Sequence, residues 1–103
     1  MDAQIKKGIL EMCILQMLSS EDYYGYTIMQ KMRQLFPEVN ESTFYAILRR
    51  LHKEGCAEAY WGNESNGPKR KYYHITENGR NNLESSLQDW KEIIGITKQV
   101  GIE

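Results

Sequence analysis

Hydrophobic residues recur at helical spacing near the start of the chain, and residues 5–19 are therefore predicted to form a helix. From Ile9 to Leu18 the apolar side chains cover almost the whole circumference of this helix. A helix that is apolar all round is buried on several sides, and a chain of 103 residues has little material to bury it so completely. The pattern is a first indication that a partner chain covers part of this helix.

A second helix is expected to open at residues 23–26 and to run to about Phe36, because Pro37 cannot continue a helix. Its apolar residues recur at intervals that place them on one side. They are Ile28, Met32 and Leu35.

Residues 41–54 form the third predicted helix, which begins after Asn40, a favourable N-cap residue, and ends at Gly55. Its apolar residues have i, i+3, i+4 and i+7 spacing and form one core-facing stripe: Phe44, Ile47, Leu48 and Leu51. The opposite face is small or polar near its start and cationic further along. That face comprises Ser42, Ala46, Arg49 and Lys53, with Tyr45 and Arg50 beside it.

The hydrophobic pattern then changes to one typical of β-strands. Residues 57–61 and 69–75 predict two strands joined by a loop rich in turn-forming residues. The resulting hairpin carries Lys69, Arg70 and Lys71 next to its polar tip. Alternation along the strand places Arg70 on the face opposite to the two lysines.

A last helix is expected from Thr76, which can cap it, to about Gln99. Four large apolar residues along it follow a 4-3-4 spacing, a seam that two helices could share. They are Leu83, Leu87, Trp90 and Ile94.

Three helices followed by a hairpin define the predicted fold class. It is a mainly α protein with a small β-hairpin (α+β), organised as a winged helix-turn-helix over residues 1–75. One C-terminal dimerisation helix follows over residues 76–103. In this motif the second helix of the pair, here 41–54, enters the major groove of DNA.

Net charge alone argues mildly against DNA binding, since it is −1 and the isoelectric point is about 6.1. Phosphate contacts depend on local charge, however, and residues 49–53 and 69–71 each carry three positive charges and no negative one. We therefore predict a surface for double-stranded DNA on the third helix and the hairpin. The predicted base-reading residues are Ser42, Thr43 and Tyr45, and the predicted phosphate-binding residues are Arg49, Arg50, Lys53, Lys69, Arg70 and Lys71.

Other functions receive little support from the sequence. No catalytic spacing, metal-ligand pattern or glycine-rich phosphate loop stands out, so we expect neither an enzyme nor a bound metal or cofactor. No export signal or bilayer-spanning stretch is visible, which predicts a cytoplasmic protein that does not enter membranes. Two alternatives stay open: a winged-helix module that binds protein, and a regulator that senses oxidants through Cys13 or Cys56.

Gly55 and five segments are distinctive in combination: 24–26, 41–51, 60–61, 67–73 and 76–79. Together they resemble the PadR-type transcriptional regulators, over about residues 5–95. The short length is similar to the subfamily with one C-terminal helix, and the hairpin is similar to that of a lactococcal multidrug-binding repressor. The resemblance implies a homodimer built from the first and last helices, repression relieved by a ligand, and Tyr24 among the DNA-binding residues.

The resemblance also implies a ligand site between two copies of the last helix, where a tryptophan stacks on planar aromatic compounds. Trp90 occupies the matching place, and Met12 and Ile9 are the next candidates for the lining. Stacking and cation–π attraction would suit flat cationic ligands. The alternative is that Trp90 only packs the dimer seam.

Overall fold

The computed structural model describes residues 1, 3–62 and 67–103, with residues 3–5 given by their backbone alone. The elements in chain order are α1 (Ala3–Ser20), β1 (Tyr23–Tyr24), α2 (Gly25–Leu35), α3 (Glu41–Lys53), β2 (Ala57–Gly62), β3 (Arg70–Ile75) and α4 (Glu77–Gln99). The strands form one antiparallel sheet in the order β1-β3-β2. The predicted α+β winged-helix fold is confirmed. Across the described ranges, every helix is too short or too polar to cross a bilayer.

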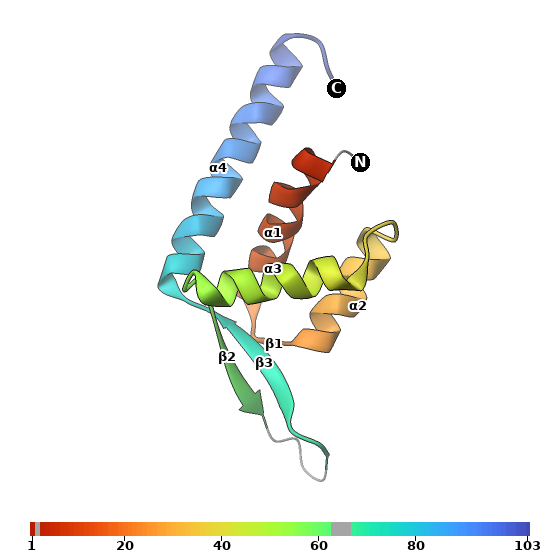
Figure 1. Ribbon diagram of the computed structural model, residues 1–103. Helices are drawn as coiled ribbons and strands as arrows, with labels where there is room; N and C mark the ends of the chain where they lie inside the picture. The colour runs from red at the N-terminus through yellow and green to blue at the C-terminus, as the bar shows by residue number, and fades with distance from the viewer. Residues whose placement is uncertain (2, 63–66) are drawn as a thin grey trace.

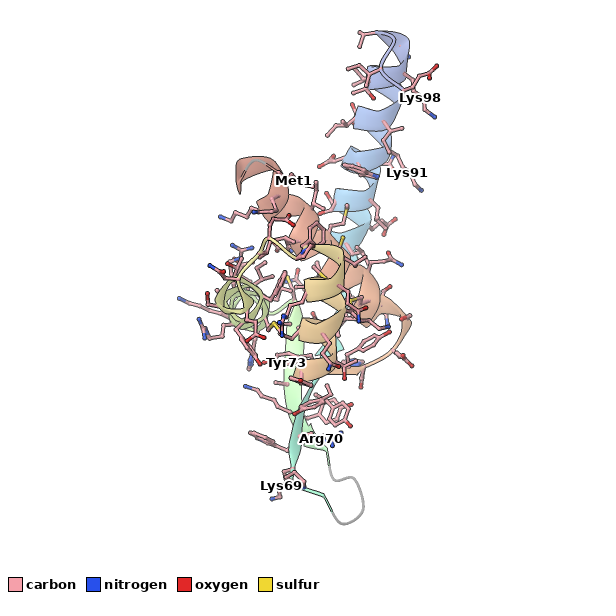
Figure 2. The ribbon with its side chains drawn as sticks, turned by 90° about the vertical axis from the view of Figure 1, so that its right-hand side faces the viewer. Met1, Lys69, Arg70, Tyr73, Lys91 and Lys98 are labelled. Atoms are coloured by element: carbon pink, nitrogen blue, oxygen red, sulfur yellow. The ribbon has the colours of Figure 1, made fainter. Side chains whose placement is uncertain are left out.

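The molecule is elongated, with extents of 56 × 30 × 21 Å. In Figure 1, α4 runs beside α1 toward the end where both termini lie, and the β2–β3 hairpin, here called the wing, extends toward the other end. Figure 2 shows Lys69 and Arg70 on the wing and Lys91 and Lys98 on α4. The cationic hairpin and the far part of α4 therefore lie at opposite ends of the protein.

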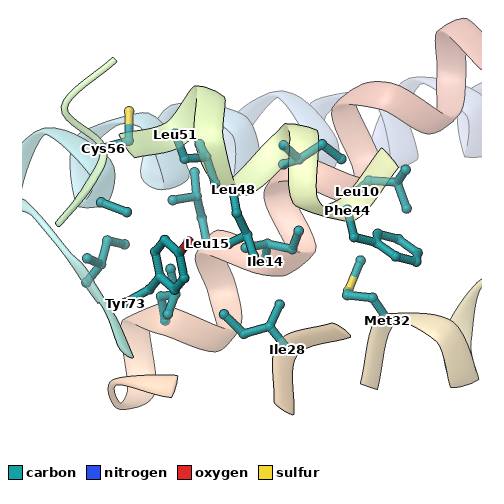
Figure 3. Packing of buried hydrophobic residues seen from close by; sticks show 14 of the residues in the cluster. Leu10, Ile14, Leu15, Ile28, Met32, Phe44, Leu48, Leu51, Cys56 and Tyr73 are labelled. Atoms are coloured by element: carbon teal, nitrogen blue, oxygen red, sulfur yellow. The ribbon is translucent and has the colours of Figure 1, made fainter. Parts of the chain in front are cut away.

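One hydrophobic core joins the helices to the sheet (Figure 3). The whole predicted stripe of α3 is buried in it, which confirms that prediction: Phe44, Ile47, Leu48 and Leu51. From α1 the core takes Leu10, Ile14, Leu15 and Leu18. Other apolar residues of α1 are only partly buried, so this chain leaves part of the α1 surface uncovered: Ile9, Met12, Cys13 and Met17.

The expectation that residues 23–26 open a helix is wrong for the first two of them. Tyr23 and Tyr24 form β1, which pairs with Tyr73 and Tyr72 of β3. The helix begins at Gly25, where an added Cβ would lie 3.1 Å from Cε2 of Tyr73. The backbone of residues 23–24 is extended because β3 offers it hydrogen-bonding partners, and no local helical signal competes with that pairing.

The apolar face predicted for the second helix is partly wrong. Ile28 and Met32 are buried, but Leu35 is 65% exposed, and the residue that joins them in the core is Met29. Leu35 is the last residue of α2, and Phe36 packs against the core just after it. The buried face of α2 includes Gly25 and Met29 as well as Ile28 and Met32, so at about 100° per residue its centre lies to one side of Leu35, which falls at the edge of that face in the last turn.

The start of α4 is built into the same core. Thr76 caps the helix as predicted, its hydroxyl accepting a hydrogen bond from the Gly79 N–H at 3.0 Å. Gly79 and Leu83 are both buried. The first two turns of α4 are therefore held by the winged-helix core, and only the later turns project from it.

Candidate nucleic-acid interface

The outer face of α3 is open to solvent along its whole length. Ser42, Thr43 and Tyr45 are exposed near its first turn, and Arg49 and Lys53 are exposed further along. Within the described part of the chain, no ion pair or side-chain hydrogen bond engages Arg49 or Lys53. Their charges are therefore available to an external anion.

The one acidic residue at the start of this face is neutralised. Glu41 accepts a hydrogen bond from Nη1 of Arg33 on α2 at 2.6 Å, with both side chains about half exposed. The pair removes most of the repulsion that a carboxylate would exert on an approaching phosphate. The N-terminal end of α3 therefore presents its positive helix dipole and polar side chains to solvent.

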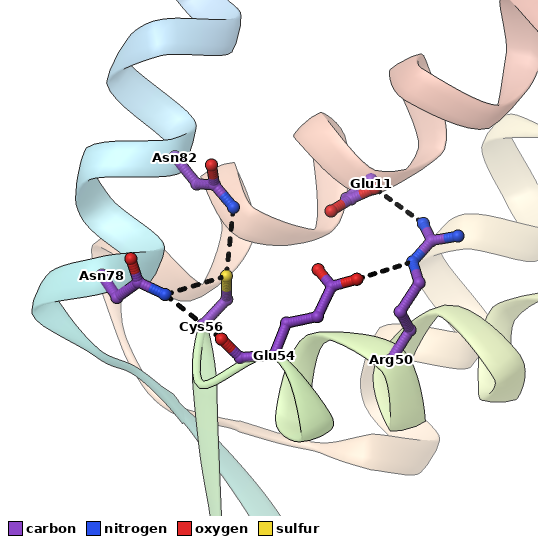
Figure 4. Close-up of polar contacts among 6 residues, drawn as sticks. All are labelled: Glu11, Arg50, Glu54, Cys56, Asn78 and Asn82. Atoms are coloured by element: carbon purple, nitrogen blue, oxygen red, sulfur yellow. Dashed lines mark hydrogen bonds and ion pairs between the residues drawn. The ribbon is translucent and has the colours of Figure 1, made fainter.

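Arg50 differs from the other predicted phosphate-binding residues. Its Nη2 lies 2.6 Å from Oε2 of Glu11, and its Nε lies 4.0 Å from Oε1 of Glu54 (Figure 4). The side chain is only 31% exposed. Two carboxylates of its own chain therefore engage this guanidinium, and the contact to Glu11 joins α3 to α1.

The wing carries cations on both faces of its sheet. The Arg70 guanidinium carbon lies 5.1 Å from the ring centroid of Tyr24, and Lys71 Nζ lies 5.7 Å from that of Tyr73. Arg70 and Lys71 point to opposite faces because they are neighbours in β3. Lys69 is exposed just before the strand begins.

A row of tyrosines covers the outer face of the sheet. Tyr24 lies with its ring centroid 6.0 Å from those of Tyr26 and Tyr72, and Tyr72 stacks on Tyr60 at 5.7 Å with an angle of 16°. Gly62 makes room for the row, since an added Cβ would lie 2.5 Å from Cε2 of Tyr72. This row links β1, the start of α2 and both wing strands.

Asp22 ties the base of the wing to the turn after α1. It accepts a hydrogen bond from the Tyr60 hydroxyl at 2.6 Å, and His74 Nδ1 lies 2.7 Å from its other oxygen. Partial burial acts to raise the pKa of Asp22, but the hydrogen bonds from Tyr60 and His74 and the charge of His74 outweigh it, so this pKa is lowered. The bond to Asp22 raises the pKa of Tyr60. At neutral pH the carboxylate stays ionised and the phenol protonated, so the bond between Tyr60 and Asp22 persists.

Two cations near the start of the chain are not among the predicted DNA-binding residues. Lys6 and Lys7 line a hollow of about 400 Å³ between α1 and α3, with Thr43 and Arg50 on its other side. Folding brings them beside the first turns of α3. Their adjacency to each other was visible in the sequence, but their distance of more than thirty residues from α3 concealed the connection.

The residues predicted for a ligand site lie together. Ile9, Met12 and Trp90 line one hollow of about 460 Å³ between α1 and α4. The rest of its lining is Gly8, Ser86, Asp89 and Ile93. The hollow is mainly apolar and carries one carboxylate.

The four residues of the predicted 4-3-4 seam divide between two environments. Leu83 is buried in the core of its own chain and Leu87 packs against that core, whereas Trp90 is exposed. Ile94 is half-buried. A second apolar stripe, which we call the α4 stripe, is exposed to solvent and comprises Trp90, Ile93, Ile96 and Val100.

The two cysteines are poorly placed to react with oxidants. Cys56 is 0% exposed, and its sulfur receives a hydrogen bond from Asn82 Nδ2 at 3.1 Å (Figure 4). Burial raises the pKa of the Cys13 thiol, which lowers the fraction present as the reactive thiolate. Neither environment favours the redox-sensing alternative.

The fold is that of a winged helix-turn-helix protein of the DNA-binding class. It combines a buried stripe on α3, an exposed cationic outer face on the same helix, and a cationic wing. The sequence profile of the transcriptional regulator PadR-like family matches residues 14–85. The chain belongs to this family of transcriptional regulators.

Individual relatives agree with this assignment. A PadR-like transcriptional regulator from Bacillus cereus is 39% identical, with a TM-score of 0.84 over 98% of this chain and 100% of that one. A PadR family transcription regulator from Clostridium difficile is 32% identical, with a TM-score of 0.79 over 88% of this chain and 96% of that one. An uncharacterized protein of Lysinibacillus sphaericus is 37% identical over 94 residues, which cover 88% of this chain and 86% of that protein.

Proposed function

We propose that this regulator is a repressor that binds a pseudo-palindromic operator as a homodimer, with α3 of each protomer in a major groove. The observation that carries the proposal is the exposed cationic face of α3, unpaired among the described residues and opposite a fully buried stripe. A two-fold dimer presents two such helices, so its half-sites lie about 34 Å apart or a multiple of that distance.

The placement of side chains suggests a division of roles. Ser42, Thr43 and Tyr45, near the start of α3, are proposed to meet base edges. Phosphates are proposed to be held by the exposed cations of α3 and the wing, together with Tyr24 beside Arg70: Arg49, Lys53, Lys69, Arg70 and Lys71. Arg50 is not included among them, because Glu11 and Glu54 engage its guanidinium. We propose instead that Arg50 joins α3 to α1.

Replacing Arg49 or Lys69 with alanine is expected to weaken binding to the protein's own promoter and to other DNA sequences alike. Each lost phosphate contact lowers the magnitude of the slope of log K against log salt by about 0.9, hence by about 1.8 for the two copies in a dimer. Gel-shift or anisotropy titrations at several salt concentrations measure this slope. Unchanged slopes in both variants, or no retardation of promoter DNA at low salt, would contradict the proposal.

Arg50→Ala is the matched control for Arg49→Ala, since the two cations are neighbours on α3. Loss of the partly buried pair with Glu11 is expected to lower the free energy of unfolding by about 1 kcal/mol. Arg49→Ala is expected to leave the unfolding midpoint unchanged, because its side chain has no partner in the described part of the chain. The two substitutions therefore separate DNA contact from stability.

We propose further that the hollow at Trp90 binds a flat aromatic effector whose binding releases DNA. The lining supports this, since Ile9, Met12 and Trp90 supply apolar and aromatic surface and Asp89 supplies a negative charge. The flat cations that the family resemblance implies fit both features. A second copy of the chain would close the open side of the hollow.

Titration of the DNA-free protein with ethidium, a flat aromatic cation, is expected to quench tryptophan fluorescence in a saturable manner. Trp90→Ala is expected to weaken binding about tenfold or more, within the range that truncating a buried aromatic anchor costs at interfaces. Trp61→Ala is the control, because it removes the other tryptophan and leaves the hollow intact. Equal ethidium affinity in Trp90→Ala and the unmodified protein, measured by ethidium emission, would rule out this role of Trp90.

A further inference from the structure

Trp61 is an exposed tryptophan on the wing. It lies on β2, at the edge of the sheet, and is 65% exposed. Within the described part of the chain it takes part in no ring stacking and no cation–π contact. An indole is among the most costly side chains to leave in water, so a contact that the isolated chain lacks is the natural explanation for its position.

The register of the sheet shows which way Trp61 points. It is the Cα partner of Lys71, and alternation places it on the same face as Tyr73 and Ala57, which are buried beneath the helices. The row of tyrosines lies on the other face. Trp61 therefore extends the helix-facing surface of the sheet toward the tip, on the side where α3 contacts β2.

The charges beside Trp61 favour a polyanion. Lys71 lies directly across from it, and Lys69 is exposed two residues further toward the tip. The nearest carboxylate of the same strand, Glu58, points to the opposite face. The surface thus combines one large apolar ring with two ammonium groups, and it faces the same side as α3.

We infer that Trp61 is the apolar contact of the wing with duplex DNA. The indole packs against deoxyribose and base edges in the minor groove while Lys69 and Lys71 bind the flanking phosphates. Proteins that bind the minor groove frequently place apolar side chains in it. The inference rests on the proposed function, since it requires that α3 and the wing bind one duplex.

Fluorescence of a Trp90→Phe protein tests the inference, because Trp61 is then the only tryptophan. Promoter duplex is expected to shift its emission to shorter wavelength and to protect it from acrylamide quenching. Binding is followed by anisotropy of a labelled duplex in the same samples, so that Trp61 spectra are compared at a known bound fraction. Unchanged emission and quenching with the duplex bound would overturn the inference and leave the proposed function standing.

Substitutions at Trp61 and Lys71 separate apolar from ionic contact. In the Trp90→Phe background, Trp61→Ala is expected to weaken duplex binding about thirtyfold, the lower end of what aromatic truncation costs at nucleic-acid interfaces when both copies in a dimer are lost, and Trp61→Phe to retain part of that affinity. Trp61→Ala should leave the salt slope unchanged, whereas Lys71→Ala should lower its magnitude by about 1.8 for two lost phosphate contacts. Full affinity in Trp61→Ala would overturn the inference.

Two further outcomes would also overturn it. An equal shift of Trp61 emission by the single strand at the same bound fraction would assign Trp61 to base stacking instead. Loss of duplex affinity together with a lower unfolding midpoint in Trp61→Ala would assign it to wing stability. Absence of duplex binding by the unmodified protein would overturn the proposed function as well, and the Arg49 titrations report that failure separately.

Discussion

Gly79→Ala is expected to destabilise the protein by about 3 kcal/mol, at the upper end of what overpacking a core usually costs. An added Cβ would lie 2.0 Å from the carbonyl oxygen of Cys56 and 2.8 Å from Cγ1 of Ile75. The first obstacle is backbone that enters the sheet and the second is buried, so neither can move aside cheaply. The better helix propensity of alanine, about 1 kcal/mol, does not offset this collision.

Gly95→Ala is the matched control on the same helix. Nothing lies within 4 Å of the Cβ that it would add, so the change is expected to be neutral or to stabilise by up to about 1 kcal/mol. Urea unfolding at one fixed protein concentration measures both variants, because the stability of a dimer depends on concentration. Equal stability of the two variants would show that α4 does not dock on the core through Gly79.

The double variant Ile96→Glu/Val100→Glu is expected to convert the proposed dimer, of about 24 kDa or twice the 12.1 kDa chain, into a monomer. Both side chains lie on the exposed α4 stripe, so the fold of one chain does not depend on them. Burying four carboxylates in a two-fold interface without partners is prohibitive. Light scattering after size-exclusion chromatography gives the mass directly.

Operator affinity should fall with the loss of the dimer. Two linked reading helices gain roughly 100- to 10,000-fold over one, so the monomer is expected to lose at least about 100-fold in affinity for a full operator. Gln88→Glu/Gln99→Glu is the control, since it adds the same charge at two exposed polar positions of α4 outside the α4 stripe. If both double variants remain dimeric, the α4 stripe is not the interface.

Much of the DNA-binding half of the protein was predictable because the signals are local. The stripe of α3 has a strict helical period, and burial of Phe44, Ile47, Leu48 and Leu51 follows from that period once a core exists. The opposite face must then be exposed, which brings Arg49 and Lys53 to the surface. The cap at Thr76 was equally local, since it depends on one hydroxyl and one N–H three residues later.

Features that depend on residues distant in sequence were not predictable. The strand at Tyr23 and Tyr24 exists only because β3 lies beside it, and two residues carry no period of their own. Arg50 was predicted to bind phosphate from its place among cations, yet Glu11, far earlier in the chain, engages it. Lys6 and Lys7 join the surroundings of α3 for the same reason.

The sequence by itself therefore determined the class of fold, the α3 helix with its exposed cationic face, and the cationic wing, because these depend on periodicity and charge within short segments. Only the tertiary structure decided how the apolar residues of α4 divide between the chain's own core and solvent. It also decided that Ile9, Met12 and Trp90 line one hollow, and that Trp61 faces the side of α3. Helical or strand period fixes which residues share a face, but what that face meets depends on how distant segments pack.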